Sequence, residues 1–159
     1  MTTGWVKQSD FTKITQGLSD DTLYVGYSEQ QQHSSGFTMA QLGAMMSEGF
    51  IHHGENIPPR PHLEEGLGEA KELLKVAIKK YLRAKKRTQE PDTNNLVTIA
   101  KDAVSQYVYS GALRGIAPNA PSTIQKKGHD LPLVDTGELV DQGLKAFVVR
   151  RELLNVRND

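Results

Sequence analysis

The segment Gly66–Arg87, GLGEAKELLKVAIKKYLRAKKR, decides the fold class. Its apolar residues recur every three or four positions, which is the spacing of one face of an α-helix. Glu64 and Glu65 come just before it, where the positive end of a helix dipole favours negative charge. We therefore expect one long amphipathic helix whose apolar stripe packs on a core and consists of Leu67, Ala70, Leu73, Leu74, Ala77, Ile78, Tyr81 and Leu82.

The opposite side of this helix is basic, and two interpretations of it stay open. Such a face is usually solvated, and cations also suit the C-terminal end of a helix dipole. The functional alternative is an anionic partner, either a phosphate backbone or an acidic protein surface. Tyr81 belongs to the apolar stripe, so no aromatic residue is interleaved with the charges on the basic side, which counts against stacking on nucleic-acid bases. The candidate residues are Lys75, Lys79, Lys80, Arg83, Lys86 and Arg87.

A second helix is expected after the break at Glu90-Pro91-Asp92, with Asp92 or Thr93 as its cap and Gly115 after its end. The short link predicts an antiparallel helical hairpin. Runs of β-branched and aromatic residues predict strands at Thr22–Tyr27 and Leu144–Val149. The expected fold class is therefore α+β, with a small, mostly antiparallel sheet packed against a long helical hairpin.

Shorter helices are expected on either side of the hairpin. Thr38 is a cap for a helix that carries Met39, Leu42, Met45 and Met46 and ends at Gly49. After the hairpin, Pro121 suits the first turn of a short helix that ends at Gly128. A low-polarity stripe at Phe11, Ile14 and Leu18 suggests one more short helix near the start of the sequence.

The composition limits the functional classes. The 159 residues hold 19 basic and 19 acidic residues, so bulk charge predicts neither a nucleic-acid nor a membrane partner. There is no cysteine, which removes disulfides, thiol catalysis and thiolate metal sites. No apolar run reaches bilayer-spanning length, and no signal peptide is expected. The length suits one domain at 1–150, followed by a tail at 151–159 that is expected to order on assembly.

Residues 50–63 show no periodicity and contain three histidines, His52, His53 and His62. Three histidines suggest a zinc site. Two observations count against it, because adjacent histidines tend to point apart and no nearby carboxylate has a clear ligand spacing. The run Ile57-Pro58-Pro59-Arg60-Pro61 is a stiff spacer, in which Arg60 is either solvated or a preorganised interface contact. HExxH and GxSxG motifs are absent, so we expect no enzyme, metal or cofactor.

The run Leu131-Pro132-Leu133-Val134-Asp135-Thr136-Gly137-Glu138-Leu139 combines turn and core chemistry. Pro132 limits the chain to extended or turn geometry. Asp135, Thr136 and Gly137 form a turn signal, in which Gly137 can take a positive φ. Asp135 or Thr136 is alternatively the N-cap of a short helix.

Three segments together resemble a known family. They are Asn56-Ile57-Pro58-Pro59-Arg60-Pro61-His62-Leu63, Asn119-Ala120-Pro121-Ser122-Thr123-Ile124, and Pro132–Leu139. Their order and spacing resemble the tail-completion or neck proteins of tailed bacteriophages, also called virion morphogenesis or head–tail joining proteins. Val25-Gly26 fits the same pattern, and the resemblance runs from about Thr22 to Val149.

The sequence departs from the family pattern at three places, which leaves the subfamily open. Ser47-Glu48-Gly49-Phe50 replaces an Asn-Glu-aromatic-Gly run. His62 stands where the family often has Phe, and Val140-Asp141-Gln142 stands where it often has a polar residue followed by Ser-Ile.

The resemblance implies a structural virion protein that is assembled in the host cytoplasm. Such proteins form rings, commonly sixfold, at the head-proximal end of the tail, between a tail terminator or tail tube protein and the head connector or adaptor. DNA passes through this neck. A ring requires head-to-tail contacts between copies. The interface candidates are Ile57, Pro58, Pro59, Arg60, Pro61, Met45, Met46 and the tail from Arg150.

Overall fold

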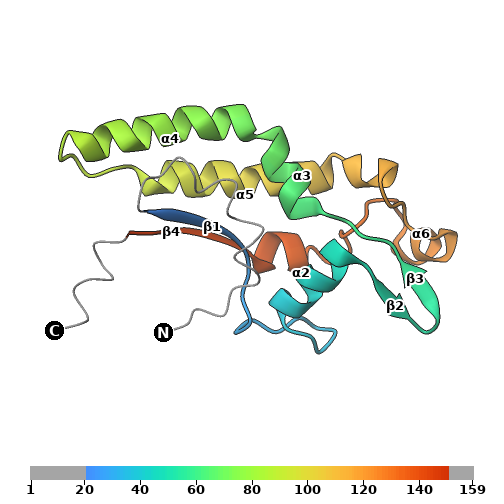
Figure 1. Ribbon diagram of the computed structural model, residues 1–159. Helices are drawn as coiled ribbons and strands as arrows, with labels where there is room; N and C mark the ends of the chain where they lie inside the picture. The colour runs from blue at the N-terminus through green and yellow to red at the C-terminus, as the bar shows by residue number, and fades with distance from the viewer. Residues whose placement is uncertain (1–20, 151–159) are drawn as a thin grey trace.

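The computed structural model describes residues 21–150, which adopt an α+β fold (Figure 1). The short helix expected around Phe11 and the tail at 151–159 lie outside the described residues. The elements are β1 (Thr22–Tyr27), α2 (Met39–Glu48), β2 (Phe50–His52), β3 (Glu55–Ile57), α3 (His62–Glu69), α4 (Lys71–Lys86), α5 (Thr93–Tyr109), the 3-10 helix η2 (Ala112–Gly115), α6 (Pro121–Lys127), the π-helical turn η3 (Glu138–Gly143) and β4 (Leu144–Val149).

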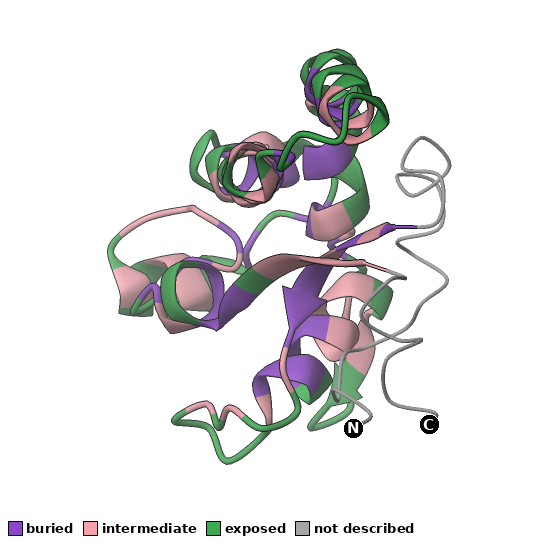
Figure 2. Ribbon diagram, turned by 90° about the vertical axis from the view of Figure 1, so that its left-hand side faces the viewer, coloured by how far each residue is buried: buried purple, intermediate pink, exposed green. Residues whose placement is uncertain are grey.

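The main sheet pairs strands from the two ends of the described chain. β1 and β4 are antiparallel, with Thr22 opposite Val149 and Tyr27 opposite Leu144. Both strands have the bounds that the sequence predicted. Alternate residues of β1, among them Leu23 and Val25, are buried in the main core. Figure 2 shows the buried residues gathered between the sheet and the helices, while the outer side of α4 is exposed.

The long helical hairpin is present, but its first arm consists of two helices. The single helix predicted over residues 66–87 is wrong, because α3 ends at Glu69 and α4 begins at Lys71. α3 starts earlier than predicted, so Glu64 and Glu65 lie in its first turn. The break lets α3 pack closely against α5, at a place where the chain carries a glycine.

Gly66 is the residue that permits this close packing. A Cβ atom at Gly66 would lie 2.8 Å from the Cα atom of Val104 and 3.2 Å from the carbonyl oxygen of Ala103. Both of these are backbone atoms of α5 and cannot turn aside. Gly68, two residues further along the same helix, points to a different side, and a Cβ atom there would have no neighbour within 4 Å.

The predicted caps are largely confirmed. Thr38 forms a capping box with Gln41 at the start of α2, and the Asp92 side chain accepts a hydrogen bond from the Asn95 N–H at the start of α5. Gly128 ends α6 in the left-handed region, with φ of 77°. The prediction that Gly115 follows the end of α5 is wrong. Gly111, with φ of 79°, occupies that position, and Gly115 lies in η2.

The hairpin of β2 and β3 was missed because its strands are only three residues long and mostly exposed. Its turn consists of His53 and Gly54, with φ of 48° and 82°. Two successive positive φ angles are typical of the tight turns that join hairpin strands. An Asn-Gly or Asp-Gly pair would have signalled this turn, whereas His-Gly is a weaker signal.

A buried carboxylate fastens the start of β1 to α4. Asp21 is 1% exposed and accepts hydrogen bonds from the Tyr81 hydroxyl at 2.7 Å and from the Lys85 ammonium at 2.8 Å. Burial, followed by the Asp21 contact, raises the pKa of Tyr81 to about 12. Lys85 therefore points toward the sheet and does not belong to the exposed basic side of α4.

Two alanine substitutions in the same helix test the packing of α3. We expect Gly66→Ala to lower the free energy of unfolding by about 1–3 kcal/mol, because the new methyl group forces α3 away from α5. Gly68→Ala is the matched control and should raise stability by up to about 1 kcal/mol, as alanine is the better helix former. Urea unfolding followed by circular dichroism measures both. Equal effects would show that the close approach at Gly66 does not exist.

Candidate functional site

Arg60 is the point at which several separate segments meet. Its side chain is 8% exposed. The guanidinium Nε donates to the Ala117 carbonyl at 3.0 Å, and Nη2 donates to the Pro118 carbonyl at 3.2 Å and to Asn119 Oδ1 at 3.5 Å. Its backbone N–H donates to the Met46 carbonyl of α2 at 2.8 Å. We call this set of contacts the Arg60 junction.

Two opposing influences act on the charge of the Arg60 guanidinium. Burial lowers the pKa of its guanidinium, and the carboxylate of Asp130 acts in the opposite direction. Because arginine starts from so high a pKa, the group stays protonated at neutral pH. The proline residues on both sides, Pro59 and Pro61, hold the backbone of Arg60 in place for these contacts.

His62 connects the Arg60 junction to the sheet. Its Nδ1 lies 2.8 Å from the Arg60 carbonyl oxygen, and its Nε2 lies 2.8 Å from the Tyr27 hydroxyl. A carbonyl oxygen can only accept, so Nδ1 carries the proton and Nε2 accepts from Tyr27. Burial lowers the pKa of His62 to about 4, despite the opposing bond to the Arg60 carbonyl. His62 is therefore neutral at pH 7.

These contacts correct the expectations for the proline-rich run. Arg60 binds inside its own chain, so it is not the outward interface contact that the sequence suggested. Met46 is half-buried and packs against the main core, and Met45 is half-buried as well. Among the neighbours of Arg60, Pro59 is exposed, while Ile57, Pro58 and Pro61 are partly exposed. These four residues remain candidates for contact with another molecule.

The turn predicted at Asp135, Thr136 and Gly137 is present. Gly137 has φ of 78°, which confirms the expected positive angle, and Gly137 rather than Asp135 or Thr136 precedes η3. The Thr136 hydroxyl oxygen accepts from the Glu138 N–H at 3.3 Å. Leu133 also has a positive φ, 64°, which is rare for a leucine.

Glu138 fastens the loop at 28–36 to this turn, a contact that the sequence did not reveal. Its carboxylate accepts from the Ser34 N–H at 2.9 Å and from the Ser34 hydroxyl at 2.7 Å. The hydroxyl bond is the main reason that the pKa of Glu138 is lowered, and the Ser34 N–H and His33 act in the same direction while burial opposes them. The two segments are about a hundred residues apart, so no local pattern signals the pair.

A hollow of about 340 Å³ lies where the three segments of the family resemblance converge. We call it the motif hollow. One wall contains Asn119, whose Nδ2 atom is buried and has no hydrogen-bond partner in the described part of the chain. Another contains Lys127, whose ammonium donates to the Leu131 carbonyl at 2.8 Å. The lining residues are His33, Ser34, Ser35, Leu42, Met46, Arg60, Asn119, Thr123, Lys127 and residues 133–139.

The chemistry of the motif hollow suits binding of a polar group. Burial lowers the pKa of Lys127, and the nearby Arg60 adds to this, whereas Asp135 and Asp130 oppose it. The Asn119 amide is a donor that no described group satisfies, beside apolar residues such as Leu42 and Leu139. A carbonyl oxygen on an otherwise apolar ligand would complement such a wall.

The lining of the motif hollow includes the three residue types of a catalytic triad, in Ser35, His33 and Glu138. Their geometry is that of a turn. The Ser35 hydroxyl and the Ser35 N–H lie 2.8 Å and 3.0 Å from the same atom, His33 Nδ1. The other ring nitrogen of His33 is 3.5 Å from the Glu138 carboxylate, which already binds Ser34. We interpret the contacts as loop structure.

The histidines considered for zinc do not converge. The His52 and His53 rings touch each other in the β2–β3 hairpin, with centroids 4.2 Å apart, whereas His62 is buried against Tyr27. No group of three or more potential metal ligands is found among residues 21–150. Within the same range, no helix has the length and apolar character needed to cross a membrane.

The predicted basic side of α4 is exposed. Lys75 pairs with Glu72 at 2.6 Å. The remaining candidates lie on the exposed surface and form no ion pair with another described residue: Lys79, Lys80, Arg83, Lys86 and Arg87. Two apolar residues share this face, Leu73 at 58% and Val76 at 66% exposure. The prediction that Leu73 lies in the buried apolar stripe is therefore wrong.

Comparisons with protein-family models, with curated proteins and with solved structures found no match to this chain.

Replacing Arg60 tests whether it is an internal structural residue. We expect Arg60→Ala to lower the free energy of unfolding by about 2–4 kcal/mol, because it removes charge-assisted hydrogen bonds and leaves buried carbonyls without donors. Arg114→Ala is the control, since Arg114 is exposed and, among residues 21–150, its side chain binds only the Gly111 carbonyl of its own turn. If Arg60→Ala lowers the free energy of unfolding no more than Arg114→Ala does, Arg60 is not an internal structural residue.

The neutral, buried His62 predicts a pH dependence of stability. Between pH 6.5 and about 4 the unfolded chain binds a proton at this residue that the native chain does not, so stability falls as the pH drops through this window. Between pH 7 and pH 4.5 the wild type should lose about 2 kcal/mol more than His62→Gln in urea unfolding. Equal losses in the two proteins would mean that His62 titrates normally in the native state.

Proposed function

We propose that this protein is a structural component of a tailed-bacteriophage virion. It forms a ring, sixfold in the family that it resembles, at the head-proximal end of the tail, where it completes the tail and joins it to the head connector or adaptor. Its partners are further copies of itself, the connector, and the tail terminator or tail tube protein. It is assembled in the host cytoplasm and remains in the neck of the particle.

One observation carries this proposal beyond the sequence resemblance. The three segments that make up the resemblance lie far apart along the chain, yet all of them line the motif hollow. Arg60 of the first segment also donates to Asn119 Oδ1 of the second at 3.5 Å. A set of motifs that forms one physical unit is more informative than three separate short matches, because each motif then has a structural reason for its place.

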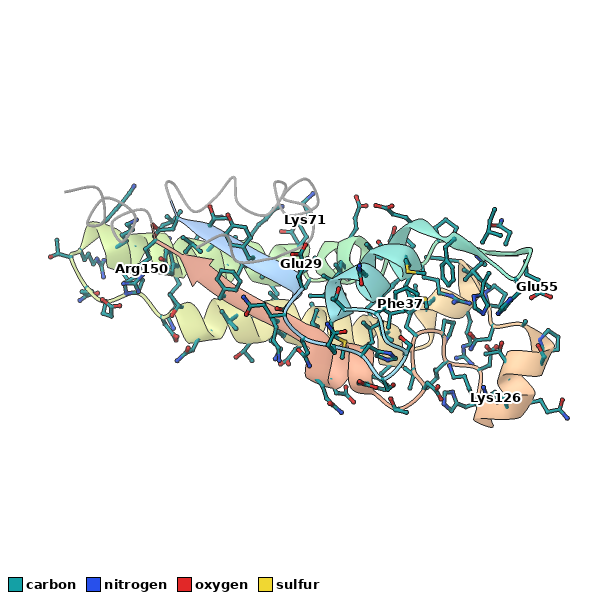
Figure 3. The ribbon with its side chains drawn as sticks, turned by 90° about the horizontal axis from the view of Figure 1, so that it is seen from below. Glu29, Phe37, Glu55, Lys71, Lys126 and Arg150 are labelled. Atoms are coloured by element: carbon teal, nitrogen blue, oxygen red, sulfur yellow. The ribbon has the colours of Figure 1, made fainter. Side chains whose placement is uncertain are left out.

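Exposed apolar residues support a role in assembly. Ile51 on β2 is 77% exposed, and Ile116 after η2 is 49% exposed. β2, β3 and α6 lie together at one end of the molecule, and the β4 terminus lies at the other (Figure 1). Figure 3 shows the same arrangement, with Glu55 and Lys126 at the end opposite Arg150. Distinct surfaces at two ends suit the head-to-tail contacts from which rings are built.

A nucleic-acid-binding module is the second candidate function, and the exposed cations of α4 are the observation that favours it. In a virion neck this face would line the path of the exiting DNA. Retention of duplex DNA should then fall steeply between about 50 and 200 mM salt. No retention at the lower concentration removes this candidate.

Deleting the gene tests the proposal. We expect lysates of the deletion to contain filled heads and free tails as separate objects in electron micrographs, because the joint between them is missing. Adding the purified protein to such a lysate should restore joined, infectious particles, while Arg60→Ala protein should restore fewer. Particles that join normally without the gene would contradict the proposal.

A further inference from the structure

Charge is strongly segregated within this neutral chain. Residues 71–87 hold eight Lys and Arg residues and one Glu, which gives a formal charge of +7. The rest of residues 21–150 holds seven basic and fourteen acidic residues, which gives −7. A molecule with zero net charge, one strongly basic helix and an acidic remainder attracts its own copies where the basic helix meets acidic side chains.

The exposed side of α4 has the make-up of a protein-binding surface. Val76 lies between Glu72 and Lys79 and Lys80 along the helix, and its side chain and that of Leu73 are more than half exposed. Toward the C-terminal end of α4 their neighbours are cations, and after Glu72 the helix carries no acidic residue. An apolar centre with a charged rim is typical of interfaces between proteins. A phosphate backbone offers nothing that would bury Leu73 and Val76.

The adjoining helix α3 carries the opposite charge. Glu65 and Glu69 are exposed, and no cation among the described residues forms an ion pair with either of them. Both carboxylates lie close enough to Tyr107 of α5 to raise its pKa, which is raised chiefly by burial. The acidic side of α3 is therefore next to the end of α5, and the basic side of α4 is a separate surface.

We propose that the basic side of α4 in one copy docks against the acidic side of α3 in a second copy. Leu73 and Val76 would be buried at the contact, with Lys79 and Arg83 near Glu65 and Glu69 of the other copy. The two surfaces differ, so the contact can be repeated head-to-tail from copy to copy, as a ring requires. This inference deepens the proposed ring function and rests on it for the closure of the contacts into a ring.

Two charge reversals and their mixture test the contact. Lys79→Glu with Arg83→Glu places two carboxylates where the proposed contact meets Glu65 and Glu69 of the other copy, and Glu65→Lys with Glu69→Lys places two ammonium groups where it meets Lys79 and Arg83. We expect each double variant alone to self-associate at least about tenfold more weakly than the wild type in sedimentation velocity at low salt. An equimolar mixture of the two variants should regain association, because every contact between unlike copies is again complementary.

The controls separate a specific contact from net charge. Lys101→Glu with Lys145→Glu changes the net charge as much as the α4 variant does and should associate like the wild type, because Lys145 is exposed on β4, Lys101 is partly exposed on α5, and neither lies on α3, α4 or α6. Raising salt to about 500 mM should weaken wild-type association, since exposed charges are then screened within a few ångströms. Circular dichroism confirms that each variant is folded.

The remaining outcomes decide the matter. Three results would overturn the inference. The wild type stays monomeric at low salt, the mixture does not regain association, or the control variant self-associates as weakly as the α4 variant. A wild type that binds duplex DNA through Lys79 and Arg83 but does not self-associate also overturns it. If self-association fails while the deletion experiment still separates heads from tails, the proposed function stands and only this contact is wrong. A closed dimer would support the contact and count against the ring.

Discussion

A buried chain of hydrogen bonds from the sheet to the loop after the helical hairpin is the constraint on which the rest of this structure depends. The Tyr27 hydroxyl donates to His62, His62 donates to the Arg60 carbonyl, and the Arg60 guanidinium donates to the carbonyls of Ala117 and Pro118. Buried polar groups are costly without partners, so each member of the chain fixes the next. The two stretches of prolines limit how far the segments can yield. Neighbouring segments, including α2 and the turn at Gly137, then enclose the motif hollow.

This arrangement suits a protein whose task is to hold neighbours in place. The interior contacts of Arg60 hold together an end with exposed apolar residues, while the basic charge is concentrated on α4 and the neighbouring α3 exposes glutamates. Rigid surfaces lose little conformational entropy on binding, which favours assembly from moderate contact areas. The functional proposal and the charge-based contact therefore depend on different parts of the molecule, and either can fail without the other.

Much of the fold follows from local patterns, and the exceptions have specific causes. Thr38, Asp92 and Gly128 were recognisable as helix ends because capping chemistry is local. The break at Ala70 was not recognisable, because alanine favours helix. The bend is explained by the packing of Gly66 on α5, which is a tertiary contact. The inward direction of Arg60 was also hidden, because its acceptors are backbone carbonyls nearly sixty residues away. Carbonyls have no sequence signature. The resemblance to neck proteins rests on three segments that all line the motif hollow, but no sequence pattern gave a reason for their meeting.

Native-state hydrogen exchange at single residues tests the central claim most directly. If the buried chain joins the sheet, the proline-rich run and α2 into one cooperative unit, the Arg60 amide, which donates to Met46, should open with the same free energy as the hydrogen-bonded amides of the β1–β4 ladder. An Arg60 amide that exchanges through a separate opening, several kcal/mol below that of the ladder, would show that the proline-rich run is an independent loop. The convergence of the three segments would then be incidental to the fold.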